Sequence, residues 1–153
     1  MRARHTLSEL PGHLIRRLNQ HSTAVFQSYL KAAGHDITSV QFLALETLAQ
    51  NPGLDQATLA AQIAYDRATI GGVVKRLEQK ELIKRQYSTT DRRAFQLRLT
   101  DEGRALLDKM RPIVASLQSD ILEGLSAQER DIFIKLMQKA LHLRPSDDQP
   151  IQT

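Results

Sequence analysis

The apolar positions in the first third of the chain recur at helical spacing. Between residues 8 and 33 they return every three or four positions, and at about 100° per residue they share one stripe of an α-helix. The stripe holds Leu14, Leu18, Val25 and Tyr29, and it is widened by Ile15, Phe26 and Leu30. Ser8 can cap this helix and Gly34 can end it. A second helix is predicted after Thr38, and the turn Asn51-Pro52-Gly53 follows it.

Two shorter helical patterns come next, separated by a tight turn. Asp55 can cap the first, over residues 56–64, and Asp66 can cap the second, over residues 67–81. The buried stripe of the second helix is expected to be Ile70, Val73, Val74 and Leu77. Two short helices joined by a tight turn are typical of a helix-turn-helix.

The pattern then changes from helical to alternating. Residues 82–87 and 94–99 predict two strands, and in the second strand Phe95, Leu97 and Leu99 alternate with Gln96 and Arg98. The polar, turn-prone residues 88–93 lie between the strands. This segment therefore predicts a β-hairpin with a charged tip.

Two further helices complete the predicted order of elements. Thr100 can cap a long helix over residues 101–125, which Pro112 should kink. Its apolar row is expected to be Leu106, Met110, Ile113, Leu117 and Ile121. A capping box from Ser126 to Glu129 opens a last helix. The apolar residues of this last helix are Ile132, Phe133, Leu136, Met137 and Ala140.

The order of elements predicts a mainly α fold with a small β wing. We expect a winged helix-turn-helix domain over residues 38–100, with helical dimerisation regions over 8–34 and 101–141. The flanking helices have wide apolar faces and no obvious internal partner, so pairing with a second copy of the chain is expected. Residues 1–7 and 142–153 are expected to be flexible termini.

Composition narrows the chemistry. The 153 residues include no cysteine, which excludes disulfides, thiolate metal sites, a cysteine nucleophile and a thiol redox switch. No apolar stretch is long enough to span a bilayer, and the N-terminus lacks a secretory apolar run. We therefore expect a cytoplasmic protein without a membrane partner.

The positive charge is concentrated in one segment. The net charge is +4, but residues 67–98 hold nine basic and three acidic side chains, an excess of six, so the rest of the chain carries −2. A basic stretch on a helix-turn-helix and hairpin indicates a nucleic-acid surface.

The helix after Asp66 has small and basic residues opposite its buried stripe. That outer face holds Ala68, Gly71, Gly72, Lys75 and Gln79, with Thr69 and Arg76 at its edge. Each interior glycine costs about 1 kcal/mol relative to alanine. Close approach to a DNA major groove would offset that cost and would let Arg67, Lys75 and Arg76 reach guanine edges or phosphates, and Thr69 a thymine methyl or a phosphate. Alternatively, the glycines let the helix pack tightly on a neighbour.

The predicted hairpin tip carries Asp91, Arg92 and Arg93. An arginine on an extended tip can enter a narrow minor groove, where the negative potential is strongest. Asp91 is then the partner that orients one of the two arginines. The alternative is a solvated charged turn, which a neighbouring basic helix-turn-helix makes less favoured.

At this point the sequence resembles the MarR family of winged-helix transcription regulators. Residues 91–103, DRRAFQLRLTDEG, look like the wing signature of that family, while 38–45 and 74–85 resemble its second helix and its recognition-helix exit. The resemblance implies a homodimer on a pseudo-palindromic operator, usually as a repressor. It implies that Arg67 to Arg76 form the groove helix, that Arg92 or Arg93 enters the minor groove, and that the phosphate contacts come from Ser39, Gln41 and Arg85. Because the chain has no cysteine, the oxidation-sensing branch of the family does not apply.

The resemblance also suggests a small-molecule effector. Many family members release DNA when a small aromatic acid binds, and residues 10–17 are similar to repressors of aromatic or nicotinate catabolism. Cations beside the aromatic arc of the first helix suit a planar carboxylate. The candidate ligand residues are His13, Arg16, Arg17, His21 and Tyr29. Alternatively, the arc is buried in a dimer core and these polar residues meet solvent or interface carboxylates.

Other functions have weaker support in the sequence. The five histidines are scattered, and no nucleophile elbow, phosphate loop or zinc-protease motif occurs, so neither an enzyme nor a cofactor is expected. A metal-responsive regulator stays open, since His13 and His21 lie two turns apart, but no cluster at metal-ligand spacing accompanies them. A ligand-independent regulator and an architectural DNA-binding protein could use the same basic surface.

Overall fold

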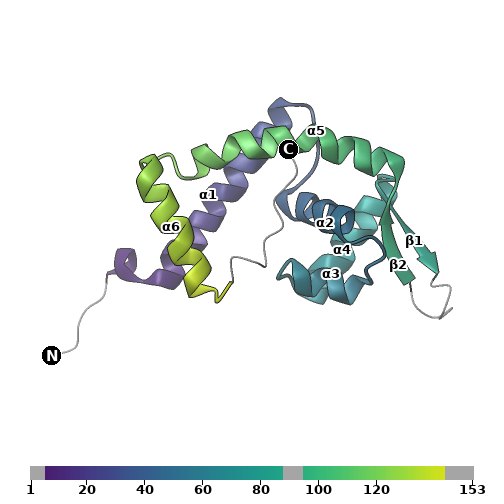
Figure 1. Ribbon diagram of the computed structural model, residues 1–153, viewed down its shortest axis with the longest axis horizontal. Helices are drawn as coiled ribbons and strands as arrows, with labels where there is room; N and C mark the ends of the chain where they lie inside the picture. The colour runs from purple at the N-terminus through teal and green to yellow at the C-terminus, as the bar shows by residue number, and fades with distance from the viewer. Residues whose placement is uncertain (1–5, 88–94, 144–153) are drawn as a thin grey trace. The chain divides into compact units, whose positions relative to one another are not determined.

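The elements follow one another as helices interrupted by a single hairpin (Figure 1). The computed structural model describes residues 6–87 and 95–143. The elements are a 3-10 turn (Leu7–Glu9), α1 (Pro11–Ala32), α2 (Ser39–Gln50), α3 (Gln56–Gln62), α4 (Arg67–Gln79), β1 (Ile83–Tyr87), β2 (Phe95–Leu99), α5 (Asp101–Ile121) and α6 (Ala127–Ala140). This order confirms the predicted mainly α fold with a small β wing. The chain forms two units, one of residues 30–110 and one of residues 1–29 and 111–153.

Side-chain caps begin α2 to α6 at the predicted residues. The backbone N–H of Thr69 donates to Asp66 Oδ1 at 2.9 Å, and that of Thr58 donates to Asp55 Oδ1 at 2.7 Å. The hydroxyl and the amide of Thr69 hold the pKa of Asp66 below its ordinary value, and the amide and the hydroxyl of Thr58 do the same for Asp55, because these hydrogen bonds favour the charged carboxylate. Thr38 and Ser126 complete capping boxes at α2 and α6, and Thr100 Oγ1 accepts from the Gly103 amide at 3.0 Å in α5.

Two predicted helix boundaries are wrong by three or more residues, and the helices predicted to end at residues 64 and 81 end two residues earlier. The first helix begins at Pro11 rather than at residue 8, because proline favours the first helical position. Thr6, not Ser8, caps the short turn before it. The long helix ends at Ile121 rather than at residue 125. Arg130 Nε donates to the carbonyl oxygens of Leu122 and Leu125, which lie in the turn that follows the helix.

The unit of residues 30–110 has a continuous apolar core. Its fully buried side chains include Leu45, Leu48, Leu59, Ile70, Val74, Leu77 and Leu97. The hairpin is antiparallel with Ile83 opposite Leu99, and Leu54 adds an isolated bridge to Leu97. In α5 the predicted apolar row is only partly correct, since two of its five residues, Met110 and Leu117, are buried. The structure buries Leu107, Met110, Val114 and Leu117, whereas Leu106, Ile113 and Ile121 are half-buried.

Gly103 joins α5 closely to the start of the hairpin. A Cβ on Gly103 would lie 2.0 Å from the backbone oxygen of Leu82 and 2.9 Å from its carbonyl carbon. The same Leu82 oxygen accepts the Thr100 amide, and the Leu82 amide donates to Leu77 O in α4. The end of α4, β1 and the first turn of α5 therefore meet at one peptide group that only glycine accommodates.

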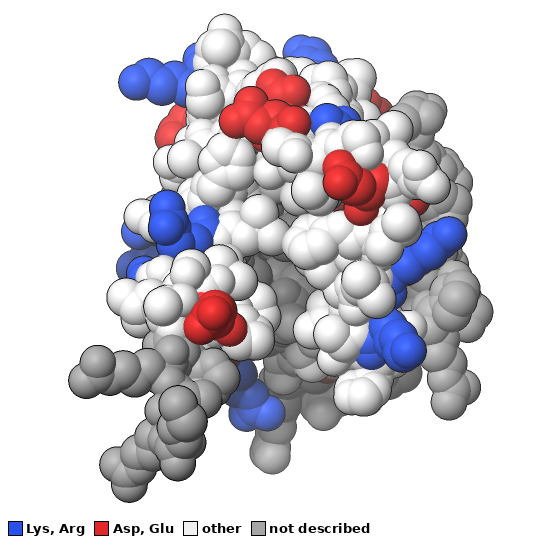
Figure 2. All heavy atoms as spheres, turned by 90° about the vertical axis from the view of Figure 1, so that its left-hand side faces the viewer, with Lys and Arg blue, Asp and Glu red and all other residues white. Residues whose placement is uncertain are grey.

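The unit of residues 1–29 and 111–143 exposes much of its apolar surface. The helix α6 contributes no buried residue, and Leu14, Ile15, Ile132 and Leu136 are 48, 67, 52 and 57% exposed. Figure 2 faces the side on which α6 lies and shows charged side chains at separated points on a largely uncharged surface. Exposed apolar side chains of α1 and α6 also line one groove, and such grouping is typical of an interaction surface.

Candidate nucleic-acid interface and effector region

The helix α4 has one face in the core and one face open to solvent. Ile70, Val73, Val74 and Leu77 are buried, as the sequence predicts. Most of the proposed groove residues are exposed on the other side, namely Arg67, Ala68, Thr69, Gly72, Lys75 and Arg76. The predicted outer face is therefore accessible as a unit.

The two glycines of α4 do not serve tight packing inside the chain. A Cβ on Gly72 would meet nothing within 4 Å, and one on Gly71 would lie in ordinary contact, 3.4 Å from Gln56 Nε2. Among the described residues, no neighbour lies so close to either glycine that a side chain there would be excluded. Tight packing inside the chain therefore does not explain why α4 carries two glycines. The open side of Gly72 leaves room for an external surface to approach the helix backbone.

The basic residues of this face differ in how they are held. Among the described residues, no carboxylate lies within ion-pairing distance of Lys75 or Arg76. The positive charge of Arg67 is close enough to Asp55 to help lower the pKa of that carboxyl, after the larger effect of the hydrogen bonds from Thr58. The hydroxyl of Thr69 donates to Asp66 Oδ2 at 2.6 Å, which leaves its methyl group for an external contact.

The two candidate phosphate contacts on α2 have different environments. Ser39 is the first residue of the helix and is half-buried. Gln41 is only 3% exposed, and its amide oxygen accepts from the Thr38 amide at 3.1 Å. Gln41 thus completes the capping box of α2, a role that the sequence pattern did not reveal, and we leave it out of the proposed set of DNA contacts.

The structure describes the two strands at the base of the hairpin, and the tip between them lies outside the described residues. Asp91, Arg92 and Arg93 lie outside the described residues. Arg85 on β1 donates from Nε to Glu78 Oε1 of α4 at 2.9 Å, and its guanidinium carbon lies 5.8 Å from the centre of the Phe95 ring. No sequence signal pairs Glu78 with Arg85, because the two residues meet only through the bend between helix and strand.

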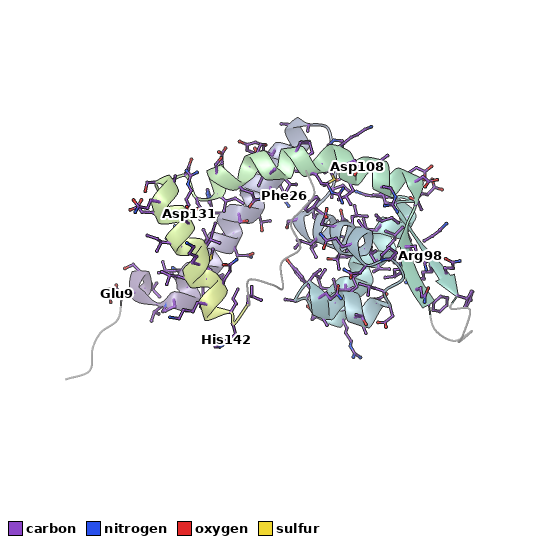
Figure 3. All side chains as sticks on the ribbon, in the orientation of Figure 1. Glu9, Phe26, Arg98, Asp108, Asp131 and His142 are labelled. Carbon is purple, nitrogen blue, oxygen red and sulfur yellow. The ribbon has the colours of Figure 1, made fainter. Side chains whose placement is uncertain are left out.

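Arg98 on β2 occupies an environment that the sequence pattern did not predict (Figure 3). Its Nη2 donates weakly to Gln96 Oε1 at 3.4 Å, and its buried Nε has no hydrogen-bond partner among the described residues. A Cβ on Gly53 would lie 3.2 Å from Arg98 Nη2, and Gly53 has a left-handed φ of 91°. Arg98 therefore covers the turn between α2 and α3 and is not part of the face formed by α4.

The five candidate effector residues all lie on α1. Arg16, Arg17 and His21 are exposed and His13 is half-buried. The Tyr29 hydroxyl donates to Asp120 of α5, and this hydrogen bond and the nearby negative charge raise the pKa of Tyr29. The structure therefore gives the Tyr29 hydroxyl an internal acceptor.

A separate apolar groove of about 780 Å³ lies beside α1. Its walls come from α1, the end of α5 and α6, and include Leu14, Ile15, Leu18, Ile121, Phe133 and Met137. None of the five candidate effector residues lines it. The sequence predicted the apolar residues of this groove but did not place them around one space.

The described residues contain no group of three His, Asp or Glu side chains placed to hold a metal ion. Within the same residues, no helix combines the length and the apolar character needed to cross a membrane.

Comparison with known proteins identifies the family. The sequence model of the MarR family matches residues 37–95, which span α2 to the start of β2. The HTH-type transcriptional repressor NicR of Pseudomonas putida is 36% identical over 135 residues, which cover 88% of this chain and 84% of NicR. The chain belongs to the MarR family. It is a winged-helix transcriptional regulator and not an enzyme, as the sequence predicted.

Solved structures support the same conclusion for this MarR-family protein. BpsR of Bordetella bronchiseptica, described for regulation of its DNA binding by 6-hydroxynicotinic acid, is 30% identical with a TM-score of 0.82. That match covers 92% of this chain and 99% of BpsR. The transcriptional repressor CouR, bound to a 23-mer DNA duplex, is 31% identical with a TM-score of 0.78, over 88% of this chain and 94% of CouR.

Proposed function

We propose that this MarR-family regulator is a homodimeric repressor that binds a palindromic operator and is released by a small aromatic or heteroaromatic carboxylate. In this proposal α4 lies in the major groove, and Arg92 or Arg93 at the hairpin tip enters the adjacent minor groove. Ser39 contributes a phosphate contact. One chain then contacts a major groove and the adjacent minor groove of the duplex, and the second chain makes the same contacts at the other half-site.

The exposed face of α4 is the observation that carries the DNA-binding part. It combines two cations without carboxylate partners among the described residues, Lys75 and Arg76, with a glycine whose outer side is open. Unpaired cations attract phosphates and release counterions, while an open glycine lets a helix backbone approach base edges. Relatives with this fold include a repressor bound to a DNA duplex.

Operator binding is tested on sites mapped genome-wide with the native protein. Purified protein should prefer a mapped operator over random duplex by about a thousandfold or more, as sequence-specific regulators do. A ratio near one would instead favour the architectural alternative. Lys75→Ala should change the preference among operator variants if Lys75 reads a base, whereas uniform weakening would make it a phosphate contact.

The hairpin tip is tested with the double variant Arg92→Ala and Arg93→Ala. Without these two cations, operator binding should weaken, and the dependence of the binding constant on salt should fall by about one unit for each phosphate that is no longer neutralised. A double variant with unchanged affinity would refute the role of the tip. The double variant Lys31→Ala and Lys109→Ala, which removes two exposed cations outside α4 and the hairpin, is the charge-matched control.

Dimer formation is supported by the exposed apolar surface of α1 and α6. Ile15 and Leu136 are more than half exposed in the single chain, which favours burial against a second copy. Light scattering on a sizing column should give twice the chain mass of 17.3 kDa. Ile15→Asp and Leu136→Asp should shift the protein toward monomer and weaken operator binding together.

The effector part is supported by the cationic residues of α1 and by the relatives. His13, Arg16, Arg17 and His21 place up to four donors along one helix, and BpsR is described as responding to 6-hydroxynicotinic acid. Arginine binds a planar carboxylate bidentately, and the ring of Tyr29 offers stacking area even though its hydroxyl donates to Asp120.

A panel of hydroxylated benzene and pyridine carboxylates tests the effector. At least one acid should release operator DNA at micromolar to millimolar concentration, and replacing each of the four basic residues by alanine should identify those that bind it. No release across the panel would contradict the effector proposal. Loss of the response in Phe133→Ala alone would move the site to the apolar groove. Release by a divalent metal, reversed by a chelator, would favour the metal-responsive alternative.

A further inference from the structure

Glu78 and Arg85 connect the proposed recognition helix to the hairpin. Glu78 lies in the last turn of α4, and Arg85 lies in the middle of β1. The two side chains form an ion pair at 2.9 Å, and the Arg85 and Glu78 side chains are 40% and 28% exposed, respectively. The ion pair therefore lies at the surface of the unit but crosses from one DNA-binding element to the other.

Arg85 is held on a second side by the aromatic residues of the hairpin. Arg85, Tyr87 and Phe95 lie on one face of the two-stranded sheet, because Tyr87 pairs with Phe95 and alternate residues share a face. The Phe95 ring lies 5.8 Å from the Arg85 guanidinium carbon and 4.6 Å from the centre of the Tyr87 ring. A guanidinium over a ring is an attractive cation–π contact. Arg85 thus bridges α4, β1 and β2.

The charge of Arg85 is compensated, unlike that of the other candidate contacts. Within the described parts of residues 30–110, Lys80 and Arg85 are the cations paired to carboxylates, whereas Lys75 and Arg76 are not. A cation that already has a carboxylate partner gains less from a phosphate and releases fewer counterions. The family resemblance implies a phosphate contact for Arg85, but this geometry fits a different role.

We infer that Arg85 is a positioning residue that, through its ion pair with Glu78 and its contact with Phe95, fixes the base of the hairpin to the end of α4. The inference rests on the proposed DNA-binding function and deepens it. A correctly oriented hairpin lets the tip and α4 reach consecutive grooves together. When the ion pair is broken, α4 and the hairpin tip can each still bind DNA. They are then no longer held in the orientation that lets both bind at the same time, so the gain in affinity from simultaneous binding is lost.

The sign of the effect of Glu78→Gln separates positioning from phosphate contact. This variant removes a negative charge near DNA and frees Arg85, so a phosphate-contact role predicts tighter operator binding. A positioning role predicts weaker binding despite the favourable charge change. An exposed ion pair shifts an equilibrium by about 1.4- to 5-fold, and a dimer holds two, so operator affinity should fall about 2- to 25-fold.

Glu81→Gln is the matched control. It makes the same charge change three residues further along, at an exposed residue that forms no ion pair among the described residues. It should leave operator affinity unchanged or raise it slightly. Equal effects of Glu78→Gln and Glu81→Gln would overturn the inference.

Two further variants complete the test. Arg85→Gln should weaken operator binding with an unchanged salt dependence, because Arg85 neutralises no phosphate in this role, whereas removing a phosphate-binding arginine would reduce the slope by about 0.9 for each copy. The double variant Glu78→Arg with Arg85→Glu can form the ion pair with reversed charges. It should therefore bind the operator more tightly than either Glu78→Arg or Arg85→Glu alone. A shallower slope for Arg85→Gln together with no such gain in the double variant would overturn the inference.

Stability and operator specificity keep the outcomes distinguishable. Thermal unfolding midpoints of all four variants should stay close to that of the native protein, because the pair is partly exposed. If Lys75→Ala changes operator binding while Glu78→Gln does not weaken it, only the inference fails. If the native protein does not prefer a mapped operator over random duplex, the proposed function itself fails.

Discussion

Replacing Gly72 by alanine should make the protein more stable and a weaker DNA binder. Gly72 lies inside α4, and a Cβ there would meet nothing within 4 Å. Because alanine is about 0.8–1 kcal/mol more favourable than glycine in a helix interior, the free energy of unfolding should rise by about that amount. For a chain of this length the unfolding midpoint should then rise by about 2–4 °C.

The same methyl group should interfere with DNA. If the backbone of α4 approaches the major groove as closely as Gly72 permits, the added methyl overpacks that contact, at a cost of about 1–3 kcal/mol. Operator affinity should therefore fall roughly 5- to 150-fold, as measured by fluorescence anisotropy with a labelled operator. Gly124→Ala, which is also unobstructed but lies after α5, should leave operator affinity unchanged. Raised stability with undiminished operator affinity would refute the close approach of α4 to DNA.

Other predictions concern the anchoring and capping contacts. Gly103→Ala places a methyl 2.0 Å from the Leu82 oxygen, so it should destabilise the protein by more than about 3 kcal/mol in denaturant unfolding; a smaller loss would mean that the backbone shifts freely. The pKa of Asp66 is lowered in the folded state, so its charged cap stabilises the protein above the unfolded pKa, near 4, and is lost as pH falls through the folded value. Asp66→Asn should therefore lose less stability than the native protein between about pH 5 and about pH 3. Tyr29→Phe and Asp120→Asn should each lower the unfolding midpoint, and the double variant should lower it no further; additive losses would show that the two side chains act separately.

The local signals in the sequence predicted the elements that position the site. Asp55 and Asp66 cap consecutive helices because their side chains bond the helix amides directly, and that chemistry depends on neighbours only three residues away. The buried stripe of α4 could also be predicted from the sequence, since its apolar residues occupy a single narrow face of the helix. Local chemistry of this kind needs no knowledge of the rest of the fold.

Other features depend on distant parts of the chain. In α5 both Leu106 and Leu107 are apolar, so only the packed neighbours decide that Leu107 is buried and Leu106 half-buried. The burial of Gln41 depends on how the unit closes around the start of α2. The pair of Glu78 and Arg85 forms across a bend whose geometry the sequence pattern does not contain.

Leu82 and Gly103 bring three elements of the unit of residues 30–110 to a single peptide group. The carbonyl of Leu82 accepts the Thr100 amide, its amide donates to α4, and Gly103 lies against it without room for a side chain. A small rotation or slide of α5 at its first turn must therefore move the end of α4 and the base of the hairpin at the same time. The two elements proposed to contact DNA are thus mechanically coupled at this point, and a displacement of under an ångström there would reach both of them without passing through any side chain.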